Sequence, residues 1–334
     1  MGEAKLAILV CGGAGYIGSH AVRALIEGGQ EVIVLDNLQT GHRASVPENV
    51  KLLVGDLRDK EFIEKVFSEN KIDGVIHFAA DSLVGESMTN PAKYFENNMV
   101  GSLNLLNGMK DHGVKKIVFS STAATYGEPE NVPILETDRT LPTNPYGESK
   151  LMVEKMLKWF DMAYGIKYTV LRYFNVAGAY PTGVIGEDHK TETHLIPIIL
   201  QVALGKREKI GIYGDDYPTA DGTCIRDYIH VMDLVDAHLL AMDRLGKGGE
   251  SRIYNLGNGE GFSVKEVIDV AREVTKHPIP AEVSPRRAGD PARLVASSQK
   301  AMDELNWTPK YNSLKSIIET AWNWHKNNPE GYRD

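Results

Sequence analysis

The 334-residue sequence predicts an α/β protein built on a doubly wound parallel sheet, with a smaller C-terminal lobe. Three observations lead to this fold class. Short apolar runs rich in Val, Ile and Leu recur through the first half, as in strands that are buried on both faces. Helical patterns separate several of these runs, which indicates a parallel sheet covered by helices on both sides. After about Asn175 the sequence changes to longer irregular segments in which Gly, Pro, Asp and Thr recur.

The elements follow in chain order. Strands are expected at Leu6 to Val10, Val32 to Leu35, Leu52 to Val54, Val75 to Phe78, Ile117 to Phe119 and Tyr168 to Leu171. Helices are expected at Ile17 to Gly28, Lys60 to Asn70 and Pro91 to His112. A strand and then a helix are expected within Asp227 to Leu245, and a further helix, by its amphipathic spacing, within 263–276. We expect residues 1–175 with about 227–258 to form the first domain, and about 176–226 with 259–334 to form the second.

Composition and charge exclude several classes of protein. A net charge of −8 and a pI near 5.7 argue against a general nucleic-acid binder or a binder of anionic membranes. The two cysteines, Cys11 and Cys224, lie outside any metal-ligand spacing and are expected to be buried packing residues. This spacing gives no reason to expect a metal site. Neither a signal peptide nor an 18-residue apolar stretch is evident, so we expect a cytoplasmic protein.

A glycine loop follows the first expected strand in LAILVCGGAGYIGSH. The loop satisfies both GxGxxG and GxxGxxG, through Gly12, Gly13, Gly15 and Gly18. Glycines allow the tight turn and the close approach of backbone to a pyrophosphate, while the following helix directs its N-terminus at the negative charge. These features predict a Rossmann fold that binds a dinucleotide.

The residue at the end of the second strand indicates which dinucleotide. Asp36 stands where a carboxylate accepts hydrogen bonds from a ribose 2′-hydroxyl and repels a 2′-phosphate, so NAD is favoured over NADP. His42 and Arg43 follow in the loop and leave open the alternative that they hold a 2′-phosphate.

The segment NPYGESKLMVEK combines a helix start with a pair of titratable residues. Asn144 suits the cap and Pro145 the first helical position, and Tyr146 and Lys150 then lie one turn apart on the same face. An ammonium group and a positively charged nicotinamide would bring the phenol toward the range of a general base. Upstream, the strand in KKIVFSSTAATYGEP ends with hydroxyl residues up to Thr122, at the sheet edge where ligands bind.

Together these motifs resemble the extended short-chain dehydrogenases/reductases, and among them the UDP-glucose 4-epimerase family. The resemblance extends to about Trp307 through GGAGYIGSH, LDNLQTG, VIHFAA, FSSTAATYGEP, NPYGESKLMVEK, LRYFNVAGA, DYPTADGTCIRDYIHVMDL, YNLGNG and RRAGDPA. It implies reversible epimerisation at C4 of UDP-galactose and UDP-glucose, through a transient 4-keto sugar and with tightly bound NAD.

The resemblance also implies residue roles. Tyr146 would take the proton of the sugar 4-hydroxyl, Lys150 would bind the nicotinamide ribose and lower the pKa of the tyrosine, and Thr122 would hydrogen-bond the reacting hydroxyl. Cofactor contacts are implied for Gly12, Gly15, Tyr16, Ile17, Gly18, Asp36, Asn37, Asp56, Leu57, Phe78, Ala79, Ala80, Asn97, Thr122, Tyr146, Lys150 and Phe174. Substrate contacts are implied for Thr122, Tyr146, Asn175, Leu195, Tyr213, Arg226, Arg287 and Asp290.

Two positions depart from the family pattern, and one is an expected core residue. Ser82 stands where many members have a lysine, and His194 stands where some have an asparagine, so their contacts are left open. His77, within the apolar VIHFAA, is expected to be a core histidine. The family also implies a homodimer formed by helix pairing, with apolar residues at Leu103, Leu106, Leu151, Met152, Val153, Met156, Leu157, Trp159 and Phe160.

Three rival functions remain to be compared. A sugar-nucleotide 4,6-dehydratase would need an acid and a base after Thr122, where this chain has Ala123 and Ala124. A 4-epimerase of N-acetylated UDP-sugars would need space near Leu294. A non-catalytic NAD sensor would not need the Tyr, Lys and Thr set.

Overall fold

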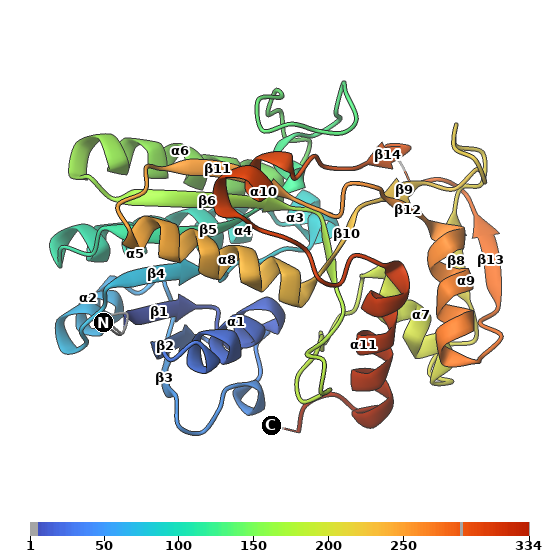
Figure 1. The fold of residues 1–334 in the computed structure, drawn as a ribbon, viewed down its shortest axis with the longest axis horizontal. Coiled ribbons are helices and arrows are strands. Elements are labelled where there is room, and N and C mark those ends of the chain that lie inside the picture. The colour runs from blue at the N-terminus through green and yellow to red at the C-terminus, as the bar shows by residue number, and fades with distance from the viewer. Residues whose placement is uncertain (1–5, 288–289, 334) are drawn as a thin grey trace.

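The computed structural model describes residues 6–287 and 290–333. Its centre is a sheet with helices on both faces, and a second group of elements, α7, α9 and α11 with two short strands, lies beside it (Figure 1). The expected α/β class is therefore confirmed.

The sheet has seven strands, all paired in parallel, in the order β11-β6-β5-β4-β1-β2-β3. In chain order they are β1 (Ala7–Cys11), β2 (Glu31–Asp36), β3 (Lys51–Val54), β4 (Gly74–His77), β5 (Lys116–Thr122), β6 (Lys167–Tyr173) and β11 (Arg252–Leu256). The six strands predicted from apolar runs are thus confirmed, while β11 was not predicted. The order reverses between β1 and β4, which is the switch point where ligands bind in doubly wound sheets.

Helices cover both faces of this sheet. The longer ones are α1 (Tyr16–Glu27), α2 (Lys60–Glu69), α5 (Gly101–Asp111), α6 (Pro145–Tyr164) and α8 (Val231–Gly246). The shorter elements near the sheet are η1 (Arg43–Ser45), α3 (Val84–Thr89), α4 (Pro91–Tyr94), η2 (Phe95–Val100), η3 (Ala123–Thr125) and α10 (Gln299–Leu305). The helix predicted at 91–112 is formed by α4, the π-helical turn η2 and α5 in succession.

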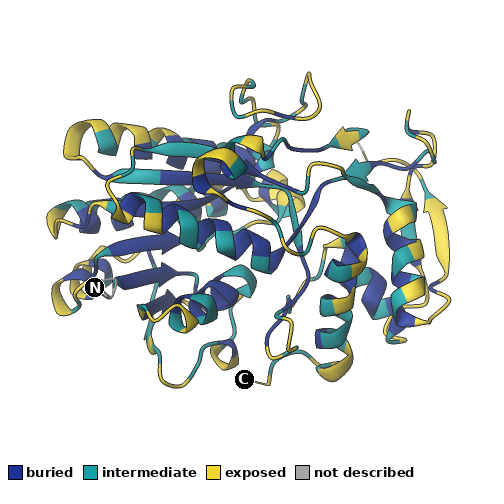
Figure 2. Ribbon diagram, in the orientation of Figure 1, coloured by how far each residue is buried: buried dark blue, intermediate teal, exposed yellow. Residues whose placement is uncertain are grey.

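Side-chain alternation along the strands supplies both layers of the core. In β1, Ile8 and Val10 pack with α1 and α8, while Leu9 and Cys11 pack with α2, α5 and α6. Because successive side chains of a strand point to opposite faces, a run of apolar residues serves both layers. Figure 2 shows that central strands of the sheet, such as β1 and β4, are buried along their whole length.

The second group of elements has its own core. It contains α7 (Leu195–Ala203), α9 (Val264–Thr275) and α11 (Leu314–Asn327), with the strand pair β8 (Ile210–Tyr213) and β13 (Ala281–Ser284). Their apolar faces meet around buried side chains such as Ile199, Val267 and Ile317. Short strands join the two groups: β7 (Asn175–Ala177), β9 (Ile225–Arg226), β10 (Tyr228–His230), β12 (Phe262–Ser263) and β14 (Arg293–Leu294).

Several single-residue expectations can be compared with the structure. Both cysteines are buried and free, and His77 is a core histidine whose Nε2 lies 2.8 Å from the Ser102 hydroxyl. Burial lowers the pKa of His77 to about 3, so its imidazole is neutral. Among residues 6–287 and 290–333, no helix has both the length and the apolar character to cross a bilayer.

The apolar residues expected at a subunit interface divide into two sets. Leu106, Leu151, Val153 and Leu157 are buried within the chain itself, so these four side chains belong to the core. Leu106, Val153 and Leu157 pack with residues of the sheet from α5 and α6. Trp159, near the end of α6, is 62% exposed.

Candidate active site

The glycine loop between β1 and α1 forms a tight backbone cradle. Gly12 has φ +78°, and a Cβ placed there would lie 2.6 Å from the Ala79 backbone nitrogen. A Cβ on Gly18 would lie 2.0 Å from the carbonyl oxygen of Gly12. Side chains are therefore excluded at both positions, and the free N-terminus of α1, capped by the backbone of Gly15 alone, is left accessible to an anion.

Asp36 closes the other side of this loop at the end of β2. Its carboxylate accepts hydrogen bonds from the backbone nitrogens of Ala14 at 2.9 Å and Leu38 at 2.8 Å. Burial raises the pKa of Asp36, and those two hydrogen bonds oppose the shift. The carboxylate is thus held rigidly where a ribose diol can donate to it.

His42 is engaged by other residues of the chain. Its Nε2 lies 3.5 Å from the Asp188 carboxylate, and its ring stacks on Tyr332 with 4.8 Å between centroids. These contacts direct the imidazole toward the C-terminal segment, which favours the NAD interpretation of the Asp36 site.

The helix α6 begins as the sequence predicts. The Asn144 side chain accepts a hydrogen bond from the Gly147 nitrogen at 2.8 Å, and Pro145 occupies the first turn. This start fixes the helix so that Tyr146 and Lys150 both line the cleft beside the glycine loop.

Lys150 is a buried cation. Its Nζ donates to the Ser120 carbonyl oxygen at 2.9 Å and lies 4.9 Å from the centre of the Phe119 ring. Burial lowers the pKa of Lys150 to about 7, although the Glu154 carboxylate acts in the opposite direction. Because burial makes the charged form of Lys150 less favourable, hydrogen bonds to hydroxyl groups, such as those of a ribose, would stabilise the ammonium group.

Thr122 and Tyr146 share a hydrogen bond between their hydroxyl groups. Burial raises the pKa of Tyr146, and the bond with Thr122 opposes that shift. In the protein alone, burial therefore raises the pKa of the phenol, whereas the lowering expected from sequence included a positively charged nicotinamide beside it. The Lys150 ammonium group donates to the Ser120 carbonyl oxygen.

One further residue of α6 anchors this arrangement. Glu154, one turn after Lys150, is buried and pairs with Arg172 of β6, whose Nε lies at 3.0 Å and Nη2 at 2.5 Å. The Glu154 carboxylate also accepts a hydrogen bond from the Ser121 hydroxyl at 2.5 Å. Arg172 also donates to Tyr126 at 2.9 Å. Sequence reasoning missed this network, although the spacing of Tyr146, Lys150 and Glu154 by four residues places all three on one helix face.

A single cleft of about 1320 Å³ collects most of the predicted site. Every predicted cofactor residue lines it, from the glycine loop, the ends of β2, β3, β4, β5 and β6, the turn η2 and the start of α6. Ser82 lines it as well. Residues from parallel strands meet here because all seven strands end at the same edge of the sheet.

The predicted substrate residues divide between this cleft and its border. Asn175, Arg287 and Asp290 line the cleft with Thr122 and Tyr146. The other three, Leu195, Tyr213 and Arg226, lie outside its lining but next to it: Leu195 follows His194, Arg287 lies over the Tyr213 ring at 4.0 Å, and Arg226 pairs with Asp290. Their contacts with a substrate stay a prediction.

Comparison with known proteins decides the family. Residues 8–257 match the NAD dependent epimerase/dehydratase family. The chain belongs to this family. It is 62% identical over 327 residues to the UDP-glucose 4-epimerase of Halalkalibacterium halodurans, an alignment that covers 98% of each chain.

Solved structures agree with this membership. The chain is similar to a crystal structure of a UDP-glucose 4-epimerase, with a TM-score of 0.97 and 62% identity over 98% of this chain and 100% of that one. It is also similar to the Bifidobacterium longum UDP-glucose 4-epimerase in complex with NAD+ and UDP, with a TM-score of 0.92 and 42% identity over 98% of this chain and 100% of that one. The family resemblance predicted from the motifs is therefore confirmed.

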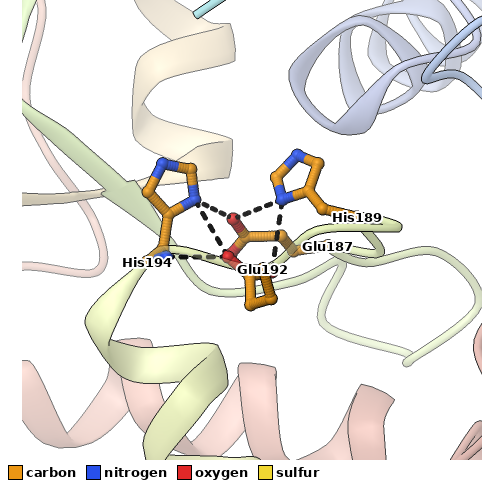
Figure 3. A group of neighbouring side chains, drawn as sticks. All are labelled: Glu187, His189, Glu192 and His194. Carbon is orange, nitrogen blue, oxygen red and sulfur yellow. Dashed lines mark hydrogen bonds and ion pairs between the residues drawn. The ribbon is translucent and has the colours of Figure 1, made fainter. Parts of the chain in front are cut away.

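A second group of titratable residues at the cleft was not predicted. Glu187, His189, Glu192 and His194 lie close together on the segment before α7 (Figure 3), and all but Glu187 line the cleft. The signal in the sequence was EDHKTETH, in which Glu and His alternate over eight residues. Burial alone would lower the pKa of His194, but the nearby Glu187 carboxylate raises it to about 9.

Proposed function

We propose that this member of the family interconverts UDP-galactose and UDP-glucose by inverting the sugar at C4, with NAD bound in the cleft. The observation that carries the proposal is the meeting of Tyr146, Lys150 and Thr122 on the wall of the cleft that the glycine loop borders. The bound NAD and UDP of the Bifidobacterium longum relative support the same pair of ligands here.

The residues of the cleft fit NAD. The side-chain-free backbone at Gly12 and Gly18 admits a pyrophosphate, Asp36 accepts from the adenosine ribose, and Lys150 would donate to the nicotinamide ribose. When bound, NAD exchanges a hydride with sugar C4, and its positive ring favours ionisation of a nearby phenol. That favourable charge offsets the effect of burial on Tyr146.

The chain's own task is to move one proton. Tyr146 takes the proton of the sugar 4-hydroxyl and later returns it to the oxygen of the 4-keto sugar. Thr122, already hydrogen-bonded to the Tyr146 hydroxyl, positions the sugar oxygen at that group. Inversion requires the 4-keto sugar to present its opposite face before the hydride and the proton return, so the reaction is redox neutral.

Arg226, Asp290 and Arg287 would hold the nucleotide part of the substrate. Guanidinium groups bind diphosphates in bidentate fashion, and Asp290 would accept from the uridine ribose. Asn175 would contact the phosphate or the sugar, with Leu195 and Tyr213 flanking the ligand. The wide cleft next to these residues leaves space for the hexose to turn.

A direct assay tests this function. The purified protein, incubated with UDP-galactose, should give UDP-glucose by chromatography, carry bound NAD and release no net reduced nucleotide. Stoichiometric release of reduced nucleotide would instead identify a dehydrogenase. The plain UDP-hexoses are favoured over N-acetylated ones, and parallel assays of the four UDP-hexoses would measure that preference.

We further infer two domains, a homodimer and a cytoplasmic location. Residues 1–175 with 227–258 would bind NAD, and 176–226 with 259–334 would bind the UDP-sugar. The exposed apolar end of α6, with Trp159 at 62% and Met162 at 68%, supports a subunit contact. Light scattering of the wild type and of Trp159→Glu would test the dimer, because a charge there should favour monomers. The free, buried cysteines support a reducing compartment.

A further inference from the structure

The group of Glu187, His189, Glu192 and His194 is a compact set of ligand atoms. One ligand atom from each residue lies within 4.8 Å of all the others. As Figure 3 shows, the two imidazoles approach the two carboxylates from opposite sides, and each uses its Nδ1. Three of its residues, His189, Glu192 and His194, line the cleft, and the proposed reaction uses none of the four.

The spacing of these atoms can be compared with a metal centre. A tetrahedral site with bonds of about 2.0–2.1 Å separates its ligand atoms by roughly 3.3 Å. The His189 Nδ1 lies 3.4 Å from Glu187 Oε1 and 3.2 Å from Glu192 Oε2. The His194 Nδ1 lies 2.5 Å from Glu187 Oε1, a separation that would have to widen by about 0.8 Å, and 3.6 Å from the other Glu192 oxygen, Oε1. The four ligand atoms lie within 4.8 Å of one another, so an ion would draw the more distant ones together.

The carboxylates are buried and held in place. The side chains of Glu187 and Glu192 are 3% and 5% exposed, and the Glu192 Oε1 accepts hydrogen bonds from the backbone nitrogens of Thr193 and His194 at 2.8 Å each. Such outer contacts orient a ligating carboxylate and leave its other oxygen available.

The charge of the group also favours a cation. Within the described part of the chain, the ion pairs of Glu187 and Glu192 involve only His189 and His194, and neither carboxylate pairs with a lysine or an arginine. Two buried carboxylates this close repel each other unless positive charge lies between them. The imidazoles supply that charge when protonated, and although burial opposes it, the carboxylates raise the pKa of both histidines. A divalent cation would take the place of those protons.

We propose that Glu187, His189, Glu192 and His194 form a binding site for a divalent transition-metal ion of the zinc class. Imidazole ligands favour such ions over magnesium and calcium, which prefer oxygen alone. The bound ion would link the four side chains of the segment 187–194 to one another and neutralise its two buried carboxylates. The sequence gives no reason to expect a metal site, so this site was not predicted.

The test titrates Co²⁺ into the untagged protein, with its nucleotide retained, after treatment with a chelator. We expect a saturable visible absorption band at about one Co²⁺ per chain, abolished when an equal amount of Zn²⁺ is added. The variants His189→Ala and Glu187→Gln should each weaken Co²⁺ binding by at least about tenfold. His277→Ala, which removes an exposed imidazole outside the group, should bind Co²⁺ as the wild type does.

The result is independent of enzyme activity. Absence of the band in the wild type would overturn the proposal and leave a cluster of ion pairs only. Equal binding by the wild type and both cluster variants would also overturn it, because the ion would then lie elsewhere. Retained nucleotide and an unchanged circular dichroism spectrum identify folded variants, and Glu192→Gln replaces any variant that fails this check.

Discussion

The hydroxyl pair of Tyr146 and Thr122 gives the most direct test of the proposed chemistry. Tyr146→Phe removes the proton-transferring group and keeps the ring. Thr122 retains a partner, since its side-chain oxygen still accepts from the Ala124 nitrogen at 3.1 Å. We therefore expect a folded protein that keeps NAD and loses turnover by about 10²- to 10⁴-fold.

The companion change Thr122→Val should have a smaller effect. It removes one hydrogen bond to the Tyr146 hydroxyl, whose net contribution is about 0.5–1.5 kcal/mol, or about 2- to 13-fold in rate. If Thr122 acts only through that hydroxyl, the double variant should be about as slow as Tyr146→Phe alone.

Conversion of UDP-galactose, followed by chromatography in all three variants, measures these effects. Thr143→Val, at an exposed threonine that lines the same cleft, is the matched control and should stay within about twofold of the wild type. A Tyr146→Phe enzyme within tenfold of wild-type turnover would refute the role of the phenol. Multiplying effects in the double variant would refute the coupling of the two hydroxyls.

Three further changes probe the cofactor loop, the buried ion pair and a buried acid. Gly18→Ala should abolish NAD retention, measured by nucleotide content, because its Cβ would lie 2.0 Å from the Gly12 carbonyl oxygen. Arg172→Met should lower the free energy of unfolding in urea by about 3–5 kcal/mol, because Glu154 would stay buried and unpaired. Burial raises the pKa of Asp227 to about 6 despite three backbone hydrogen bonds, so the folded state binds the extra proton between about pH 4 and pH 6. The free energy of unfolding should therefore fall by up to about 3 kcal/mol as pH rises across this window, and Asp227→Asn should remove that slope.

Each of these changes has a comparison that isolates its cause. Gly85→Ala adds a Cβ with nothing within 4 Å and should keep NAD. Arg252→Met breaks an exposed pair with Glu304 and should cost less than about 1 kcal/mol. For Asp227, identical pH slopes in the wild type and the variant would show that other groups produce the dependence.

Local signals predicted much of the fold and the site. Apolar runs predicted six strands because each run is buried on both faces, and Asn144 with Pro145 predicted the start of α6 because a cap is a contact within four residues. The glycine loop and Asp36 were likewise predictable, since backbone geometry restricts the residue types there.

Long-range contacts could not be predicted from the sequence. The strand β11 pairs with β6, more than 75 residues earlier in the chain, and its short apolar pattern gave no sign of that position. The partner of Glu154 is Arg172, on a strand whose register no local pattern specifies. The raised pKa of Tyr146 depends on how deeply the phenol is buried, which is a property of the packed site.

The buried pair of Glu154 and Arg172 has a consequence for where the chemistry happens. Apolar contacts alone would leave α6 with similar burial after a slide of one turn, about 5.4 Å along its axis. The two-point contact with Arg172 and the hydrogen bond from Ser121 exist at one axial position only. This charge pairing, two turns away from Tyr146 and outside the lining of the cleft, therefore acts together with the Asn144 cap and the Lys150 contact to fix the height of Tyr146 above the sheet. Sequence drift in the apolar face of α6 can be tolerated without moving the reacting hydroxyl.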